Sequence, residues 1–252
     1  MNFPIASADQ VLPSVAILAG GLATRMRPLT EKVPKALLDI GGEPFIAHQL
    51  RLLAREGAGH VVLCLGFLGE RVEAFVGDGS RFGLRVDYSY DGDKLLGTGG
   101  ALRKALPLLS DPFMILYGDS YLDIDYLPVA KAFERSRASG LMTVYRNEGR
   151  FDVSNVVYAD DRVRFYSKRE KRPDMRFIDY GLGMLRANVL NPFQQRASFD
   201  LAEVYENLAH AEDLAGFEVD QRFYEIGSPQ GLLETQDYIA MSVREDQNVE
   251  GR

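Results

Sequence analysis

Apolar and polar positions alternate with two different periods along the first half of the chain. Four short runs rich in apolar residues, at 15–18, 61–65, 85–90 and 113–117, predict β-strands. Between them, segments that begin or end at Gly or Pro predict helices at 44–56, 70–75 and 97–109. Because strands that alternate with helices build parallel sheets covered on both faces, this half predicts a doubly wound, mainly parallel α/β fold.

The second half is less regular, and its pattern predicts a mixture of short strands and helices. The predicted strands lie at 141–145, 153–158, 163–166, 180–185, 217–219 and 223–226, and the predicted helices at 129–137, 199–209 and 229–241. No internal repeat or linker divides the chain. We therefore expect one domain over residues 14–241, preceded by an N-terminal extension (1–13) and followed by a polar tail (242–252).

The loop after the first predicted strand combines glycines with cations. Gly20 and Gly21 are followed in the same loop by Arg25 and Lys35. Bare backbone lets N–H groups approach phosphate oxygens, and nearby cations neutralise their charge. An ordinary turn with solvated cations is the alternative, but glycines and cations together favour a polyphosphate site. The patterns GxxxxGK[ST] and GxGxxG are both absent, so this is a different phosphate loop.

Two further features carry candidate chemistry. The turn LGTGGAL at 96–102 has three glycines in four positions, which favours close approach by a ligand, and Thr98 adds a hydroxyl. Asp119 stands at the end of an apolar strand, and Glu225 lies near the end of the chain. Both carboxylates are natural Mg²⁺ ligands. The alternative for Asp119 is a turn cap, which would be the more common role of an isolated Asp. Ligands of open α/β sheets lie beyond the carboxyl ends of the strands, so the Gly20 loop, the turn and Asp119 should converge.

Composition and charge exclude several classes of protein. A net charge of −7 over 252 residues argues against nonspecific nucleic-acid binding. Because no stretch has the length and apolarity of a membrane span and the first 13 residues do not form a signal peptide, we expect a cytoplasmic protein without a membrane partner. The single cysteine, Cys64, is expected to be a buried strand residue without a disulfide. The sequence leaves a homo-oligomer open.

Taken together, these motifs resemble the sugar-1-phosphate nucleotidyltransferase family. The loop matches the pattern LAGGxxTRxxPLTxxxPKxLL, and the turn LGTGGA, a strand-ending Gly-Asp and an acid-Ile-Gly-x-Pro element follow in the family's order over residues 15–238. The resemblance implies a Rossmann-like nucleotidyltransferase fold with a mixed sheet and a smaller sugar-binding β subregion. It also implies the Mg²⁺-dependent reaction of an NTP with a sugar 1-phosphate to give an NDP-sugar and pyrophosphate.

Within the family, the short chain is most similar to enzymes that combine GTP with a heptose or mannose 1-phosphate. Uridylyltransferases for a hexose or N-acetylmuramate 1-phosphate are an alternative, as is a non-catalytic nucleotide-sugar sensor on the same fold. A dehydrogenase-type nucleotide-binding domain is disfavoured, because its glycine fingerprint is missing.

The resemblance also implies a role for each matching residue. Catalysis would use Arg25 and Lys35, and Mg²⁺ would be held by Asp119 and Glu225. The sugar phosphate would be bound by Lys168 and the sugar hydroxyls by Asp179. The nucleotide would contact Leu18, Gly20, Gly21, Thr24, Asp91, Gly97 and Thr98. Three positions depart from the family pattern. Glu225 replaces a frequent Asp, Ser167-Lys168-Arg169 replaces Glu-Lys-Pro, and Asp179 replaces a frequent Asn, so we expect an unusual acceptor pocket.

Overall fold

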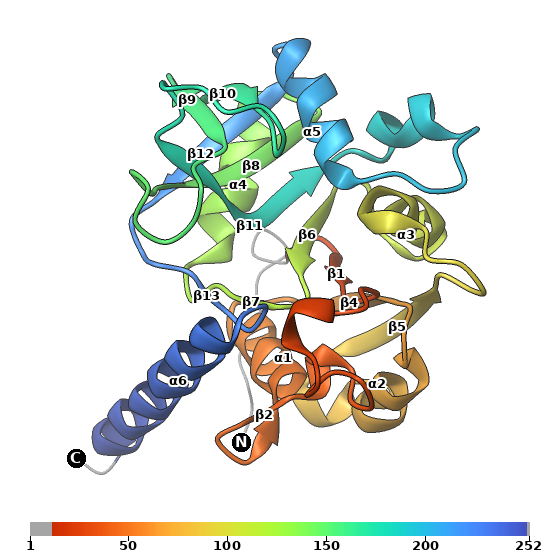
Figure 1. Cartoon of the computed structure of the whole chain (residues 1–252), viewed down its shortest axis with the longest axis vertical. Coiled ribbons are helices and arrows are strands. Elements are labelled where there is room, and N and C mark those ends of the chain that lie inside the picture. The colour runs from red at the N-terminus through yellow and green to blue at the C-terminus, as the bar shows by residue number, and fades with distance from the viewer. Residues whose placement is uncertain (1–11, 251–252) are drawn as a thin grey trace.

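The structure, a computed structural model that describes residues 12–250, is built on one large mixed sheet (Figure 1). Within the described residues this sheet has nine strands. Their order is β5 (Arg85–Tyr90), β4 (His60–Leu65), β1 (Val15–Leu18), β6 (Phe113–Tyr117), β11 (Phe177–Leu185), β8 (Gly140–Arg146), β12 (Leu214–Val219), β10 (Arg162–Tyr166) and β9 (Val156–Ala159).

The two halves of the sheet differ in strand direction. The pairs β5–β4, β4–β1 and β1–β6 are parallel, as the alternation of strands and helices predicts. Beyond β6 the sheet is mixed, because β11 runs antiparallel to both β6 and β8, whereas β12 is parallel to β8. The predicted doubly wound α/β fold with a mixed sheet is therefore confirmed. The carboxyl ends of β1, β4 and β6 lie side by side at one edge.

Helices cover both faces of the sheet (Figure 1). Along β1, Val15 and Ile17 face one core and Ala16 and Leu18 face the other, as the two-residue period of a strand requires. The first core is closed by α1 (Phe45–Arg55), α2 (Gly69–Val76) and α4 (Tyr126–Ser136). The second core is closed by α3 (Gly97–Ala105) and α5 (Leu201–His210).

Helix α1 shows how the local sequence sets its limits. Pro44 precedes it at the N-cap, and Ile46, Leu50 and Leu53 place three buried side chains on one face. Gly57, at φ +88°, lets the chain turn away after the last helical residue. This helix also carries the buried polar residue Gln49, which lies near the carboxyl end of β6.

Several element boundaries differ from the predictions. Helix α4 begins at Tyr126, three residues before its predicted start, and α6 (Pro229–Glu250) continues well beyond its predicted end at 241. Helix α6 projects from the body of the molecule (Figure 1). Most of the predicted extension, residues 1–11, lies outside the described residues, but Leu12 is buried in the first core. Among residues 12–250, no helix is long and apolar enough to cross a membrane.

Two very short sheets stand beside the main one. Strand β7 (Ser120–Tyr121) pairs with β13 (Tyr224–Glu225), and β2 (Asp39–Ile40) pairs with β3 (Glu43–Pro44). The β7–β13 pair aligns Glu225 with Ser120, and Ile226 N donates a 2.9 Å hydrogen bond to the carbonyl oxygen of Asp119. It thereby brings the two predicted metal ligands together from distant parts of the chain.

Candidate functional site

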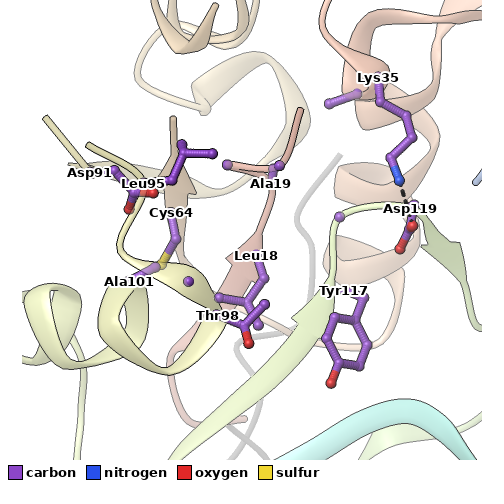
Figure 2. Close-up of a pocket in the computed structure, with 15 residues that line it drawn as sticks. Leu18, Ala19, Lys35, Cys64, Asp91, Leu95, Thr98, Ala101, Tyr117 and Asp119 are labelled. Atoms are coloured by element: carbon purple, nitrogen blue, oxygen red, sulfur yellow. Dashed lines mark hydrogen bonds and ion pairs between the residues drawn. The ribbon is translucent and has the colours of Figure 1, made fainter. Parts of the chain in front are cut away.

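A pocket of about 240 Å³ lies beyond the carboxyl ends of β1, β4 and β6 (Figure 2). This is the position at which ligands bind open α/β sheets. The structure brings many of the predicted site residues together in its lining: Leu18, Gly20, Gly21, Lys35, Asp91, Gly97, Thr98 and Asp119. Cys64, confirmed as a buried free cysteine, also lines it, and burial raises the pKa of its thiol to about 12.

A hydrogen bond and a buried side chain hold the glycine loop in place. Ala23 adopts φ +48°, and the buried Thr30 donates a 2.8 Å hydrogen bond from Oγ1 to the Ala23 carbonyl oxygen. Met26 is buried in a third hydrophobic cluster, together with Leu38, Ile40 and Phe45, whereas its neighbours Thr24 and Arg25 are exposed. Met26 therefore anchors the loop while Thr24 and Arg25 remain accessible to solvent.

The two glycines of this loop serve different purposes. A Cβ added to Gly20 would lie 3.2 Å from Gly66 N, so the close packing of these two segments favours glycine at position 20. A Cβ added to Gly21 would meet no protein atom within 4 Å. Because nothing in the fold requires glycine at position 21 and the residue lines the pocket, its bare backbone is open to a ligand.

Lys35 and Asp119 form an ion pair at the mouth of the pocket (Figure 2). Lys35 Nζ lies 2.6 Å from Asp119 Oδ2, and both side chains are about three-quarters buried. Gly118 allows the Asp119 turn to lie against the end of β1, since a Cβ there would stand 2.8 Å from Leu18 O. The pair joins the cationic loop to the acid at the end of β6.

The Asp119 turn is held by Gln49, a residue that the sequence interpretation missed. Gln49 is fully buried on α1, and its Nε2 donates hydrogen bonds to the carbonyl oxygens of Tyr117 (3.0 Å) and Ser120 (2.7 Å). These carbonyls flank Asp119 on both sides. The sequence did contain a signal for this role, because Gln49 is a polar residue next to the apolar positions 46, 50 and 53 of the predicted helix. A buried side-chain amide usually forms hydrogen bonds, often with backbone groups.

Glu225 and Arg25 complete the mouth of the site around Gly227. A Cβ added to Gly227 would lie 2.7 Å from Glu225 Oε2, 3.2 Å from Asp119 Oδ2 and 3.5 Å from Arg25 Nη2. The Glu225 carboxylate also accepts hydrogen bonds from Gly227 N and, at 2.5 Å, from Ser228 Oγ. Two carboxylates and one guanidinium thus face the same point.

This donor set fits a divalent cation that is shared with a phosphate. Among the described residues, no group of three or more His, Cys, Asp and Glu side chains gathers in a way that could hold a metal ion alone. Mg²⁺ typically takes one or two carboxylates and completes its shell with phosphate oxygens and water. Asp119 and Glu225 are therefore the residues that could hold such an ion.

The glycines of the turn at 96–102 have a packing role that the sequence interpretation missed. Gly97 adopts φ +71°, and a Cβ there would stand 2.5 Å from Phe199 O, while a Cβ on Gly99 would stand 2.3 Å from the Phe199 ring. The glycines let α3 pack against the segment that enters α5, while Gly97 and Thr98 also line the pocket, so close approach by a ligand there stays a prediction. The Thr98 hydroxyl is also engaged, since it donates to Asp200 Oδ1 (3.1 Å) and accepts from Leu201 N (2.8 Å).

Asp91 lies at the end of β5, beside the glycine loop (Figure 2). Its Oδ2 accepts a 3.1 Å hydrogen bond from Leu96 N and would lie 3.4 Å from a Cβ on Gly20. Burial raises the pKa of this carboxyl above its usual value, although the Leu96 N–H and the charge of Lys104 act in the opposite direction. Asp91 therefore offers a partly desolvated carboxyl group to whatever occupies this end of the pocket.

Lys168 and Asp179 do not line the pocket but lie next to one of its walls. Lys168 Nζ is 5.8 Å from the centre of the Tyr117 ring, which does line it, and 3.5 Å from Asp200 Oδ1. Asp179 lies on β11 at a break in the strand register, where its Oδ1 accepts a 3.0 Å hydrogen bond from Gly181 N. Burial raises the pKa of Asp179 to about 6, and the nearby charge of Lys168 opposes this rise.

Comparison with known proteins agrees with this fold. Residues 14–240 match the family model for nucleotidyl transferases, so the chain belongs to the nucleotidyl transferase family. The family resemblance in the sequence is confirmed by this match. A mannose-1-phosphate guanylyltransferase catalytic subunit beta from Xenopus tropicalis is 30% identical over 236 residues, which cover 91% of this chain. The chain spans only 65% of the length of that relative.

Two other similar proteins extend the comparison. An N-acetylmuramate alpha-1-phosphate uridylyltransferase from Neisseria meningitidis serogroup B is 42% identical over 111 residues, which cover 44% of this chain and 48% of the relative. The structure of HddC from Yersinia pseudotuberculosis complexed with GMP-PN matches with a TM-score of 0.75 and 23% identity, over 90% of this chain and 100% of that one. The likeness to HddC shows a shared fold.

Proposed function

We propose that this protein transfers a nucleoside monophosphate from an NTP to a sugar 1-phosphate, giving an NDP-sugar and pyrophosphate. The observation that carries the proposal is the convergence of Lys35, Asp119, Glu225 and Arg25 at the mouth of a glycine-lined pocket. Cations beside paired carboxylates are the groups that phosphoryl transfer requires, because its catalysis is mainly positioning and charge stabilisation. A non-catalytic sensor on the same fold would not need them all.

The residues of the pocket have separate roles in binding the two substrates and in the transfer. The open backbone at Gly21 lies against the triphosphate, and Arg25 stabilises the negative charge on the departing pyrophosphate. The Lys35 ammonium moves from Asp119 to the phosphate oxygens and holds them during the transfer. The attacking oxygen of the sugar phosphate is already anionic, so no strong general base is needed. Mg²⁺, held by Asp119 and Glu225, would supply charge neutralisation at the phosphates.

We further propose GTP as the nucleotide. Among the described residues, the Asp91 carboxylate accepts a hydrogen bond only at Oδ2. As a pure acceptor, this carboxylate matches the adjacent N–H donors of guanine better than uracil, whose single N–H is flanked by carbonyls. The guanylyltransferase relative supports this choice and suggests mannose as the sugar. The resemblance in the sequence adds a heptose as a second possible sugar. The uridylyltransferase relative, which is more identical over a shorter span, keeps UTP with N-acetylmuramate or a hexose 1-phosphate as the second candidate.

The test is pyrophosphate release from each common NTP with a panel of mannose, heptose, glucose and N-acetylmuramate 1-phosphates, with Mg²⁺ and with EDTA. Release with GTP and one sugar phosphate, lost with EDTA, is the expected result. Release only with UTP would replace the nucleotide assignment but keep the reaction. Nucleotide binding without release from any pair would favour the sensor. The cytoplasmic location and the homo-oligomer remain predictions from the sequence.

A further inference from the structure

One oxygen of Asp200 joins three separate parts of the chain. Asp200 occupies the N-cap of α5, where its Oδ1 accepts a 2.8 Å hydrogen bond from Ala202 N. The same oxygen accepts from Thr98 Oγ1 of α3 at 3.1 Å and lies 3.5 Å from Lys168 Nζ in the segment after β10. Thr98 lines the pocket, and Lys168 lies over the ring of Tyr117, which lines it as well.

These contacts exceed what a helix cap requires. The capping box of α5 is already complete, because the Glu203 side chain accepts a 3.2 Å hydrogen bond from Asp200 N. The two additional donors, Thr98 and Lys168, come from two other parts of the chain, α3 and the segment after β10. Burial raises the pKa of Asp200, but the Ala202 N–H, the Lys168 charge and the Thr98 hydroxyl together hold that pKa below its usual value. The carboxylate is therefore charged at neutral pH.

We propose that Asp200 is a positioning residue that holds the Lys168 ammonium in place for the sugar 1-phosphate and ties it, through Thr98, to the nucleotide side of the pocket. This inference rests on the proposed function, in which Lys168 binds the sugar phosphate. A lysine side chain loses conformational entropy when it is fixed in one position. A carboxylate that orders it beforehand reduces the loss at the moment of binding.

The exposure of the pair separates this role from a purely structural one. The side chains of Lys168 and Asp200 are 43% and 51% exposed, so their ion pair contributes little to the free energy of unfolding. Its removal should therefore change substrate binding more than stability.

The decisive variant is Asp200→Asn. Asparagine is as good an N-cap as aspartate and keeps an oxygen for Ala202 N and Thr98, so only the charge is lost. We expect KM for the sugar 1-phosphate to rise about fivefold, the scale set by one partly exposed charge pair. KM for the NTP should stay within about twofold and the melting temperature within about 2 °C of wild type.

A double-mutant cycle with Lys168→Met tests whether Asp200 acts through Lys168. We expect Asp200→Asn to add nothing in the Lys168→Met background, because the ammonium is already gone. Asp174→Asn, which removes an exposed carboxylate paired with Arg172 on the neighbouring loop, is the matched control and should change neither KM. Additive effects of the two variants, equal rises in both KM values, or an unchanged KM in Asp200→Asn would overturn the proposal.

Failure of the positioning role and failure of the proposed function have different signatures. A wild-type protein that forms no NDP-sugar with any substrate pair contradicts the function and, with it, the role of Lys168. An active wild type whose Asp200→Asn variant has wild-type kinetics contradicts the positioning role alone.

Discussion

Lys35 Nζ lies 2.6 Å from Asp119 Oδ2, although the two residues are 84 positions apart in the chain. The contact links the cationic glycine loop to the acid at the end of β6. It places an ammonium on the carboxylate oxygen that would also face a metal ion. On the proposed function, Lys35 and a divalent cation would compete for Asp119, and Lys35 would become available to phosphate oxygens once the carboxylate had another cation.

This competition gives Lys35→Met two opposite effects. Turnover should fall by about 10²-fold or more, because a charge that stabilises the transferred phosphate is gone. The Mg²⁺ concentration for half-maximal activity should fall as well, because no ammonium competes for Asp119. Steady-state pyrophosphate release over a Mg²⁺ titration measures both quantities. Lys32→Met, in the same loop but outside the pocket lining, is the control, and wild-type turnover in Lys35→Met would remove Lys35 from the site.

Gly21→Ala and Gly99→Ala should fail in different ways. The methyl group at position 21 meets no protein atom within 4 Å, so that variant should fold and melt like wild type but bind the NTP at least tenfold more weakly. At position 99 the methyl would stand 2.3 Å from the Phe199 ring, so the melting temperature should fall instead. Calorimetric nucleotide titration and thermal unfolding of both variants make the comparison. Normal nucleotide affinity in Gly21→Ala would show that the loop does not approach the ligand.

Gln49→Leu should loosen the Asp119 turn. The variant leaves the carbonyl oxygens of Tyr117 and Ser120 without their buried donor, which destabilises the fold by about 1–3 kcal/mol. Because these carbonyls flank Asp119, we also expect a higher Mg²⁺ requirement for turnover. Chemical denaturation and a Mg²⁺ titration of activity measure the two effects. A variant that is less stable but has an unchanged Mg²⁺ requirement would reduce Gln49 to a purely structural role.

The parts that the sequence predicted best are those whose signal is local. The apolar runs of the first half became the parallel strands, and residues at their carboxyl ends were brought together in one pocket. The two-residue strands β7 and β13 have no detectable period, so their pairing, which sets Glu225 beside Ser120, could not be derived from it. The predicted strand at 223–226 located the segment but not its partner.

Residues that act through tertiary contacts were the hardest to interpret. The glycines at 97 and 99 gave the same signal as ligand-binding glycines, but their close neighbour is Phe199, some 100 positions away along the chain. Asp200 lies within the predicted helix 199–209, and only the folded chain brings Lys168 and Thr98 to its carboxylate. Sequence spacing carries no information about such neighbours, because they depend on how α3 and α5 pack.

Asp179 makes the stability of the fold depend on pH in a predictable direction. Burial raises its pKa from 3.8 to about 6, so the folded protein favours the protonated carboxyl. This stabilisation is fully present below the unfolded value of 3.8 and is lost as the pH rises through about 6. Asp179→Asn stays neutral and keeps the oxygen that accepts from Gly181 N. The variant should therefore become more stable relative to wild type as the pH rises.

The measurement is the difference in melting temperature between Asp179→Asn and wild type across about pH 4 to 7.5, which should grow by a few degrees. Asp174→Asn gives a control without this dependence. Because Arg172 holds the pKa of the exposed Asp174 below its usual value of 3.8, this carboxyl is ionised in both the folded and the unfolded chain over most of the range, and the difference for that variant should stay nearly constant. A difference for Asp179→Asn that stays constant with pH would show that its carboxyl is ionised in the folded protein at every pH tested, and that Lys168 compensates its burial completely.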